Sequence, residues 1–234
     1  MKTDPPQSLS NKTYQLIKND ILTCSLDPGQ LIVQMDLVEK YEAGLTPVRE
    51  ALRQLAQEGF VQSVPRLGYV VSPITRQDIE EIFEVRLVLE TSSTTLAATR
   101  GSDQDIKRIV EKVDFTYIYQ DHQSYSAFLK QNAEFHISIA ASTLNQRLAF
   151  LVSKTMDELS RVFQLGLDLK DSAEEMRQDH LTLAKALINH DALLAETLVR
   201  QEIIHSRQRV MDALEKKKFT SSLMPLNYVK RPIL

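Results

Sequence analysis

Arg49 stands near the start of an expected helix, in the stretch LTPVREALRQLAQEGF over residues 45–60. Thr46 is the expected N-cap and Pro47 the first helical residue, which places Arg49 in the first turn. The helix dipole disfavours a cation there by ~0.3–1 kcal/mol, but an arginine at this position can meet a phosphate or a base edge. Arg53 lies one turn further along the same exposed face, and a solvated surface position is its alternative interpretation.

Arg86 is a second arginine whose position calls for a partner. It lies in the stretch FEVRLVLE, among apolar neighbours such as Ile82 and Leu89, on a helix face that leans toward the interior. An unpaired buried charge is costly, so the guanidinium needs an anion nearby. A structural salt bridge with Glu84 or Glu90 is one way to supply it.

The elements around Arg49 follow a recognisable order. We expect a helix over residues 10–24, a short helix over 35–42, a turn over 43–45, a helix over 46–59 and a β-hairpin with strands over 61–64 and 69–71. This order is typical of a winged helix-turn-helix, in which the second helix of the pair enters the DNA major groove by its N-terminal end. Arg66 and Gly68 fall in the hairpin turn, where Arg66 can reach the DNA backbone or the minor groove.

The remainder of the chain shows only helical periodicity. Six long helices are expected, and they make a second, all-helical bundle; they cover residues 75–100, 103–119, 124–143, 145–167, 171–189 and 191–215. The fold class is therefore mainly α. We expect a disordered N-terminus over 1–9, a DNA-binding domain over 10–73, a helical domain over 74–215 and a loose basic tail over 216–234.

Composition limits the setting in which the protein works. The 234 residues are 43% hydrophobic and 25% charged with a net charge of −3, as in a soluble globular protein. No apolar run of about 18 residues predicts a membrane span, and no signal peptide is evident. A single cysteine, Cys24, forms no disulfide within the chain. Together these features predict a cytoplasmic protein without a membrane partner.

The stretch TPVREALRQLAQEGFVQSVPRLGYVV resembles the DNA-binding signature of the GntR family of bacterial transcription regulators. The stretches IEEIFEVRLVLE, NAEFHISIA, DHLTLAKAL and HDALLAETLVRQEIIHS resemble the FCD effector domain of the FadR branch. The resemblance covers roughly residues 10–215. It implies a homodimer on a two-fold symmetric DNA operator, and a repressor of a metabolic operon whose small effector is anionic, such as a carboxylate. Thr46, Pro47, Arg49, Arg53, Arg66 and Gly68 would form the DNA-binding set.

The chain departs from the family at the DNA-binding end. Leu45 stands where the family usually has an arginine that contacts DNA. Residues 1–73 hold seven Lys and Arg against eight Asp and Glu. Without a general positive field, DNA binding must rest on the placement of individual arginines and on pairing two domains in a dimer.

The resemblance also implies a metal site, with changed ligands. The positions that match the family pattern are Asn132, His136, His180 and Glu202, where the family has an aspartate and three histidines. These residues suit a divalent metal such as zinc or nickel, and His205, one turn from Glu202, is a substitute ligand. Without the resemblance, such histidines are more often core or surface residues, and without a metal the same polar cavity can hold the effector directly.

In the FCD pattern Arg86 also lines the effector cavity, where it would clamp a carboxylate. Two further readings stay open: a metal-dependent enzyme with His136, His180 and Glu202 around an open site, and a regulator that senses the metal itself. We expect no enzyme, because no nucleophile or general base is recognisable at a fixed spacing, and because catalysis leaves the winged helix unexplained.

Overall fold

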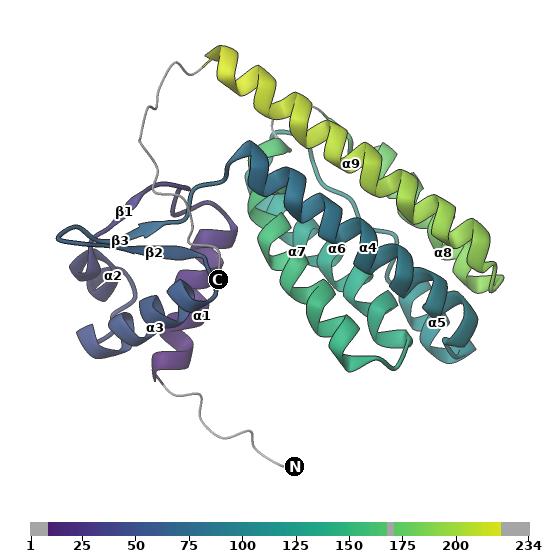
Figure 1. Cartoon of the computed structure of the whole chain (residues 1–234), viewed down its shortest axis with the longest axis horizontal. Coiled ribbons are helices and arrows are strands. Elements are labelled where there is room, and N and C mark those ends of the chain that lie inside the picture. Colours follow the sequence, from purple (N-terminus) through teal and green to yellow (C-terminus); the bar gives the residue numbers. More distant parts are fainter. Residues whose placement is uncertain (1–8, 168–170, 221–234) are drawn as a thin grey trace.

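A computed structural model describes residues 9–167 and 171–220. A small N-terminal unit of helices and a sheet lies beside a larger unit built of helices (Figure 1). The mainly α fold, with an N-terminal winged helix-turn-helix, is confirmed. The disordered start expected over 1–9 and the loose tail expected over 216–234 fall largely on residues 1–8 and 221–234, which lie outside the described residues. Leu9 and residues 216–220 are described and are helical, so the expectation is wrong there.

The N-terminal unit follows the expected order of elements. These are α1 (Leu9–Leu22), α2 (Gln34–Lys40), α3 (Leu45–Gln57), β2 (Val61–Val64) and β3 (Gly68–Val71). A short strand that the sequence pattern did not reveal, β1 (Leu31–Ile32), pairs antiparallel with β3 and gives the sheet order β1-β3-β2. α1 packs across α3, and their facing side chains form a separate core that includes Ile17, Ile21, Leu52 and Leu55.

The start of α3 differs from the expectation. Gly44 is the N-cap, and no side chain caps the helix, so Thr46 is not the cap. Pro47 is the third helical residue, which is tolerated because the first backbone N–H groups of a helix have no partner within it. Arg49 is consequently the fifth helical residue. It lies beyond the first turn, so the dipole opposes its charge less than the sequence suggested.

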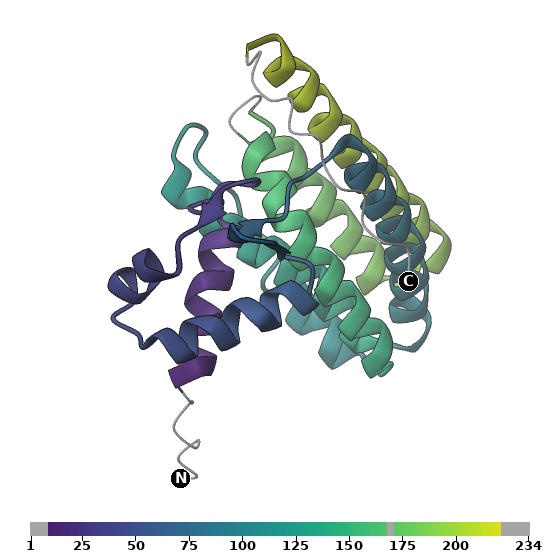
Figure 2. The same cartoon turned by 60° about the vertical axis from the view of Figure 1, so that its left-hand side comes forward.

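The helical unit contains six helices within the described part of the chain. They are α4 (Arg76–Arg100), α5 (Asp103–Val110), α6 (His122–Ser142), α7 (Gln146–Gly166), α8 (Ala173–Ile188) and α9 (Ala192–Thr220). α4 and α9 run side by side, and α6 and α7 pack together on the side of α4 that is nearer the N-terminal unit (Figures 1 and 2). Thr75 and Asp78 form the capping box that starts α4. α9 continues to Thr220, past the expected end at 215.

The expected helix over 103–119 is wrong in its second half. α5 ends at Val110, and the chain then runs in a non-helical segment in which Val113, Phe115 and Tyr117 are buried and the residues between them are exposed. The pattern VDFTY over residues 113–117 alternates apolar and polar residues with a period of two, which is the pattern of an extended segment with one buried face. Tyr117 fixes this segment by accepting a hydrogen bond from the backbone N–H of Ser172 at 2.9 Å.

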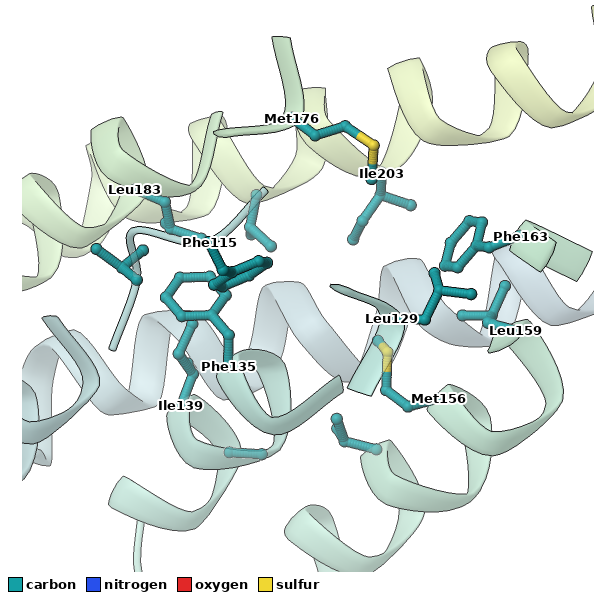
Figure 3. Close-up of a cluster of buried hydrophobic side chains, with 14 of the residues drawn as sticks. Phe115, Leu129, Phe135, Ile139, Met156, Leu159, Phe163, Met176, Leu183 and Ile203 are labelled. Atoms are coloured by element: carbon teal, nitrogen blue, oxygen red, sulfur yellow. The ribbon is translucent and has the colours of Figure 1, made fainter. Parts of the chain in front are cut away.

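A continuous apolar core fills the helical unit. Phe115, Phe135, Ile139 and Leu183 gather where the extended segment passes between α6 and α8 (Figure 3).

In the part of the chain that the structure describes, no helix combines the length and the apolar character needed to cross a bilayer.

Candidate functional site

α3 presents its polar face to the surface. Thr46, Arg49 and Arg53 are exposed and Pro47 is half-buried, while Val48 on the opposite face is fully buried. Arg49 Nε donates a hydrogen bond to Gln34 Oε1 at 3.1 Å, which ties the guanidinium to the start of α2. The helix thus offers two cations on a face that its own domain does not cover.

The hairpin between β2 and β3 holds Arg66 in an unusual backbone conformation. Its φ is +66°, in the left-handed region that an arginine rarely adopts, and Gly68 follows at +98°. The turn closes through a hydrogen bond from the Leu67 backbone N–H to the Val64 carbonyl at 3.1 Å. Strain of this kind costs of order 1–3 kcal/mol and often marks a functional position. The exposed Arg66 side chain stands at the tip.

Helix α3 and the hairpin between β2 and β3 border the same part of the surface. A hollow of about 290 Å³ is lined on one side by Leu45 and Arg49 of α3 and on the other by Leu67 and Gly68 of the hairpin. Arg49 and Gly68, which the sequence assigned to one DNA-binding set, therefore face a common space.

A cluster of charged side chains lies buried inside the helical unit. Arg86 is 1% exposed, and its Nε donates to Glu90 Oε1 at 2.7 Å while its Nη2 donates to Glu202 Oε1 at 3.1 Å. His136 bridges the same two carboxylates, with Nδ1 2.7 Å from Glu90 Oε2 and Nε2 3.2 Å from Glu202 Oε1. The salt bridge of Arg86 with Glu90, expected as the alternative interpretation, is present.

The charges in this cluster shift one another. Burial alone favours the neutral imidazole, but the charges of Glu90 and Glu202 outweigh it and raise the pKa of His136 to about 9. Burial likewise raises the pKa of the Glu202 carboxyl, yet the neighbouring imidazoles hold it well below its usual value. Two carboxylates thus face one guanidinium and one imidazolium, and the buried charges balance.

Once His136 gives up its Nε2 proton, the same cluster has the donors and the spacing to hold a metal ion. Ligand atoms of His136, His180 and Glu202 lie within 4.8 Å of one another, and all three residues are buried. His180 Nε2 is 3.6 Å from Glu202 Oε1. Tetrahedral zinc, with Zn–N bonds of about 2.0–2.1 Å, sets its ligands about 3.3 Å apart, close to these separations. Asn132 is 3% exposed and lies one turn before His136 on α6.

His205 lies elsewhere. Its side chain is exposed, and its ring groups with the carboxylates of Glu175 and Asp179 at the surface of α8 and α9. His205 is therefore not placed to replace a ligand of the buried cluster, and the expectation that it could do so is wrong. Glu202 of α9 faces the core, whereas His205, three residues further along the same helix, faces solvent.

Two contacts with functional weight were missed by the sequence analysis. Glu90 accepts hydrogen bonds from both Arg86 and His136, whereas the sequence indicated only its salt bridge with Arg86. Its position one helical turn after Arg86 predicts the contact with Arg86 but not the one with His136. The second contact joins the two units: Lys18 Nζ of α1 lies 2.6 Å from Asp157 Oδ2 of α7. Nearby, Arg161 of α7 donates to the Ser72 carbonyl at the start of the linker. No local pattern in the sequence predicts these contacts.

Comparison with known families decides the identity of the chain. Residues 81–205 match the FCD domain, and residues 9–71 match the bacterial regulatory proteins of the gntR family. The chain belongs to the GntR family of transcription regulators, in the FadR-like branch with an FCD domain. It is thus a DNA-binding regulator and not an enzyme.

Individual relatives agree with this placement. The chain is 27% identical over 199 residues to the HTH-type transcriptional repressor GlaR of Escherichia coli (strain K12), covering 82% of this chain and 90% of the relative. It is 26% identical over 174 residues to the gluconate operon transcriptional repressor of Bacillus licheniformis, covering 73% and 68%. The solved structure of Escherichia coli McbR/YncC shares the fold, with a TM-score of 0.71 at 20% identity over 90% of this chain and 99% of that one.

Proposed function

We propose that this GntR-family regulator is a homodimeric repressor, working in the cytoplasm, that leaves its operator when a small anionic effector binds the helical domain. The observation that carries the proposal is the common surface formed by α3 and the hairpin, where Arg49 and Gly68 line one hollow and Arg66 projects from the tip. The repressors named among the relatives support the sign of regulation.

Arg49 and Arg53 would enter the major groove from α3, and Arg66 would meet the DNA backbone or the minor groove. A bidentate arginine–guanine contact supplies about 1–3 kcal/mol of discrimination. Since Leu45 replaces the usual arginine and the domain carries no positive excess, one domain binds weakly. Two domains on a two-fold symmetric operator make up the affinity.

The effector would be sensed at the buried cluster of Arg86, Asn132, His136, His180 and Glu202. His136, His180 and Glu202 would hold zinc or nickel, with the Asn132 amide oxygen as a weak fourth donor. Glu90 would fix the imidazole of His136 from behind through Nδ1, which leaves Nε2 toward the metal. A bound metal would polarise a carboxylate ligand and hold it. The alternative is a direct metal sensor, and a ligand screen at constant metal concentration separates the two.

Coupling to DNA needs a path between the domains, because a ligand changes DNA affinity only if it favours one arrangement of the two DNA-binding heads. α7 offers that path. Its Phe163 ring faces the Arg86 guanidinium at 5.8 Å, and Arg161, two residues earlier, holds the Ser72 carbonyl next to the linker at 72–75.

The proposal is tested by gel-shift titration on an operator selected from random DNA by the wild-type protein. Arg49→Ala removes one contact from each half-site, so affinity falls by about 2–6 kcal/mol, or roughly 30-fold or more. Arg147→Ala is the control, because Arg147 is an exposed arginine of the helical domain. Operator affinity of Arg49→Ala equal to that of the control contradicts the proposed DNA-binding surface.

A further inference from the structure

The hollow between α3 and the hairpin has an apolar lining, whereas protein surfaces that meet DNA are mostly polar and positively charged. Its volume is about 290 Å³. Most of its lining residues are large and apolar, namely Leu31, Ile32, Val33, Met35, Leu45 and Leu67. Arg49 is the only charged residue in the lining, and Gln34 adds an amide. The hollow is therefore built mainly for apolar contacts, with one cation beside them.

The backbone holds several of these apolar side chains toward solvent. Leu31, Val33, Met35 and Leu67 are between 45% and 62% exposed. On β1 the two faces alternate, so Ile32 packs into the core of the domain while Leu31 points outward. α2 and the hairpin turn lie at the end of the N-terminal unit that points away from the helical unit (Figure 1). A group of exposed apolar side chains of this kind marks a contact surface.

DNA is the occupant that this surface fits. Every residue of the lining lies within residues 9–71, the part of the chain that matches the bacterial regulatory proteins of the gntR family. Arg49 Nε donates to Gln34 Oε1 at 3.1 Å, which holds the guanidinium beside the hollow, where it can meet a phosphate or a base acceptor. With Arg49 placed on DNA in this way, the apolar side chains next to it face the edges of neighbouring bases.

The major-groove edges of the bases offer one apolar group, the C5 methyl of thymine. An apolar side chain can contact that methyl, but it leaves the O6 and N7 acceptors of guanine and the N4 donor of cytosine without a partner. A polar group that loses its water without gaining a hydrogen bond is costly. Space is not limiting, because a methyl group is about the size of a water molecule, which needs only about 10–15 Å³ of cavity. The lining thus favours thymine over a G·C pair.

We propose that the hollow recognises thymine by its C5 methyl group, with Leu45 of α3 and Met35 of α2 as the residues in contact. The inference rests on the proposed function and narrows it, because it states which base the half-site carries next to the group that Arg49 binds. The other apolar side chains of the lining exclude water from the contact. Burial of one methyl group raises affinity about fourfold, so one thymine in each half-site contributes about 15-fold in the dimer.

Deoxyuridine provides the test, because it is thymidine without the C5 methyl and pairs with adenine in the same way. The wild-type full chain selects an operator from random DNA, and each thymine of the half-sites is then replaced by deoxyuridine, at both symmetric positions together. We expect at least one such replacement to weaken binding about 15-fold in a gel-shift titration. Replacement of a thymine in the flanking DNA is the control and leaves affinity unchanged.

The variants Met35→Ala and Leu45→Ala connect the effect to the hollow. Each shortens a side chain at the contact, so binding to the thymine operator weakens and the 15-fold difference from the deoxyuridine operator shrinks. Met35 is 60% exposed, so its removal leaves the core intact. Leu193→Ala is the matched control, because Leu193 is an exposed leucine of the helical domain, and it keeps the wild-type difference. Leu45→Arg adds hydrogen-bond donors and should select guanine where the wild type selects thymine.

The inference is overturned if the selected half-sites lack thymine, if no thymine in them is sensitive to deoxyuridine, or if Met35→Ala and Leu45→Ala both keep the wild-type difference. The Arg49→Ala gel shift reports on the proposed function separately. A loss of affinity in that variant without any deoxyuridine effect keeps the DNA-binding surface and rejects thymine recognition. If the wild type selects no operator, the proposed function is wrong and the inference is wrong with it.

Discussion

Replacing Arg86 by methionine should destabilise the helical domain strongly, because the change removes a buried cation and keeps its anions. The side chains of Glu90 and Glu202 are only 3% and 7% exposed, and Arg86 lies 2.7 Å and 3.1 Å from them. Methionine fills much of the same space, so the loss is electrostatic. Breaking a buried ion pair from one side costs about 3–5 kcal/mol.

The same helix carries a matched control. Arg76 and Glu80 form a pair with the same i,i+4 spacing at 3.0 Å, but their side chains are 57% and 41% exposed. A solvated pair of this kind is worth about 0–1 kcal/mol, so Arg76→Met should change stability very little. The contrast isolates burial, because both substitutions are chemically identical and both lie on α4.

Differential scanning calorimetry of chelator-treated protein measures the effect. At about 2–4 °C for each kcal/mol in a chain of this size, Arg86→Met lowers the melting temperature by about 6–20 °C relative to Arg76→Met. If the two variants melt within 2 °C of each other, water reaches the cluster freely, and the argument from buried, balanced charge is refuted.

Two further predictions concern the metal site and the contact between domains. Zinc or nickel should raise the melting temperature of the chelator-stripped protein. His180→Ala should lose this rise, whereas the control His190→Ala, at an exposed histidine, should keep it. If the wild-type protein shows no rise, the cluster binds neither metal. Lys18→Met breaks the contacts with Asp157 and Glu58 and should lower stability by about 1.5–3 kcal/mol. Lys40→Met should have a smaller effect, because the pair of Lys40 with Asp20 within the N-terminal domain is more exposed. Equal unfolding in urea for the two lysine variants would show that the interdomain contact contributes nothing.

The sequence by itself determined the order of elements and the family. Helical periodicity, the capping residues Thr75 and Asp78, and the turn at Arg66 to Gly68 are local signals, because a few neighbouring residues fix each of them. The expected bounds of α4, α6, α7 and α8 agree with the structure within two residues. The need of the Arg86 guanidinium for a nearby anion could be predicted for the same reason, because the apolar residues around it lie within one helical turn.

Tertiary structure decided the features that depend on residues far apart in the chain. The strand at Leu31 exists only because β3 offers it an open edge, and residues 111–119 leave the helix because Phe115 and Tyr117 gain more by packing into the core. Whether His205 joins the buried cluster depends on the rotation of α9 against α8, which spacing along one helix cannot set.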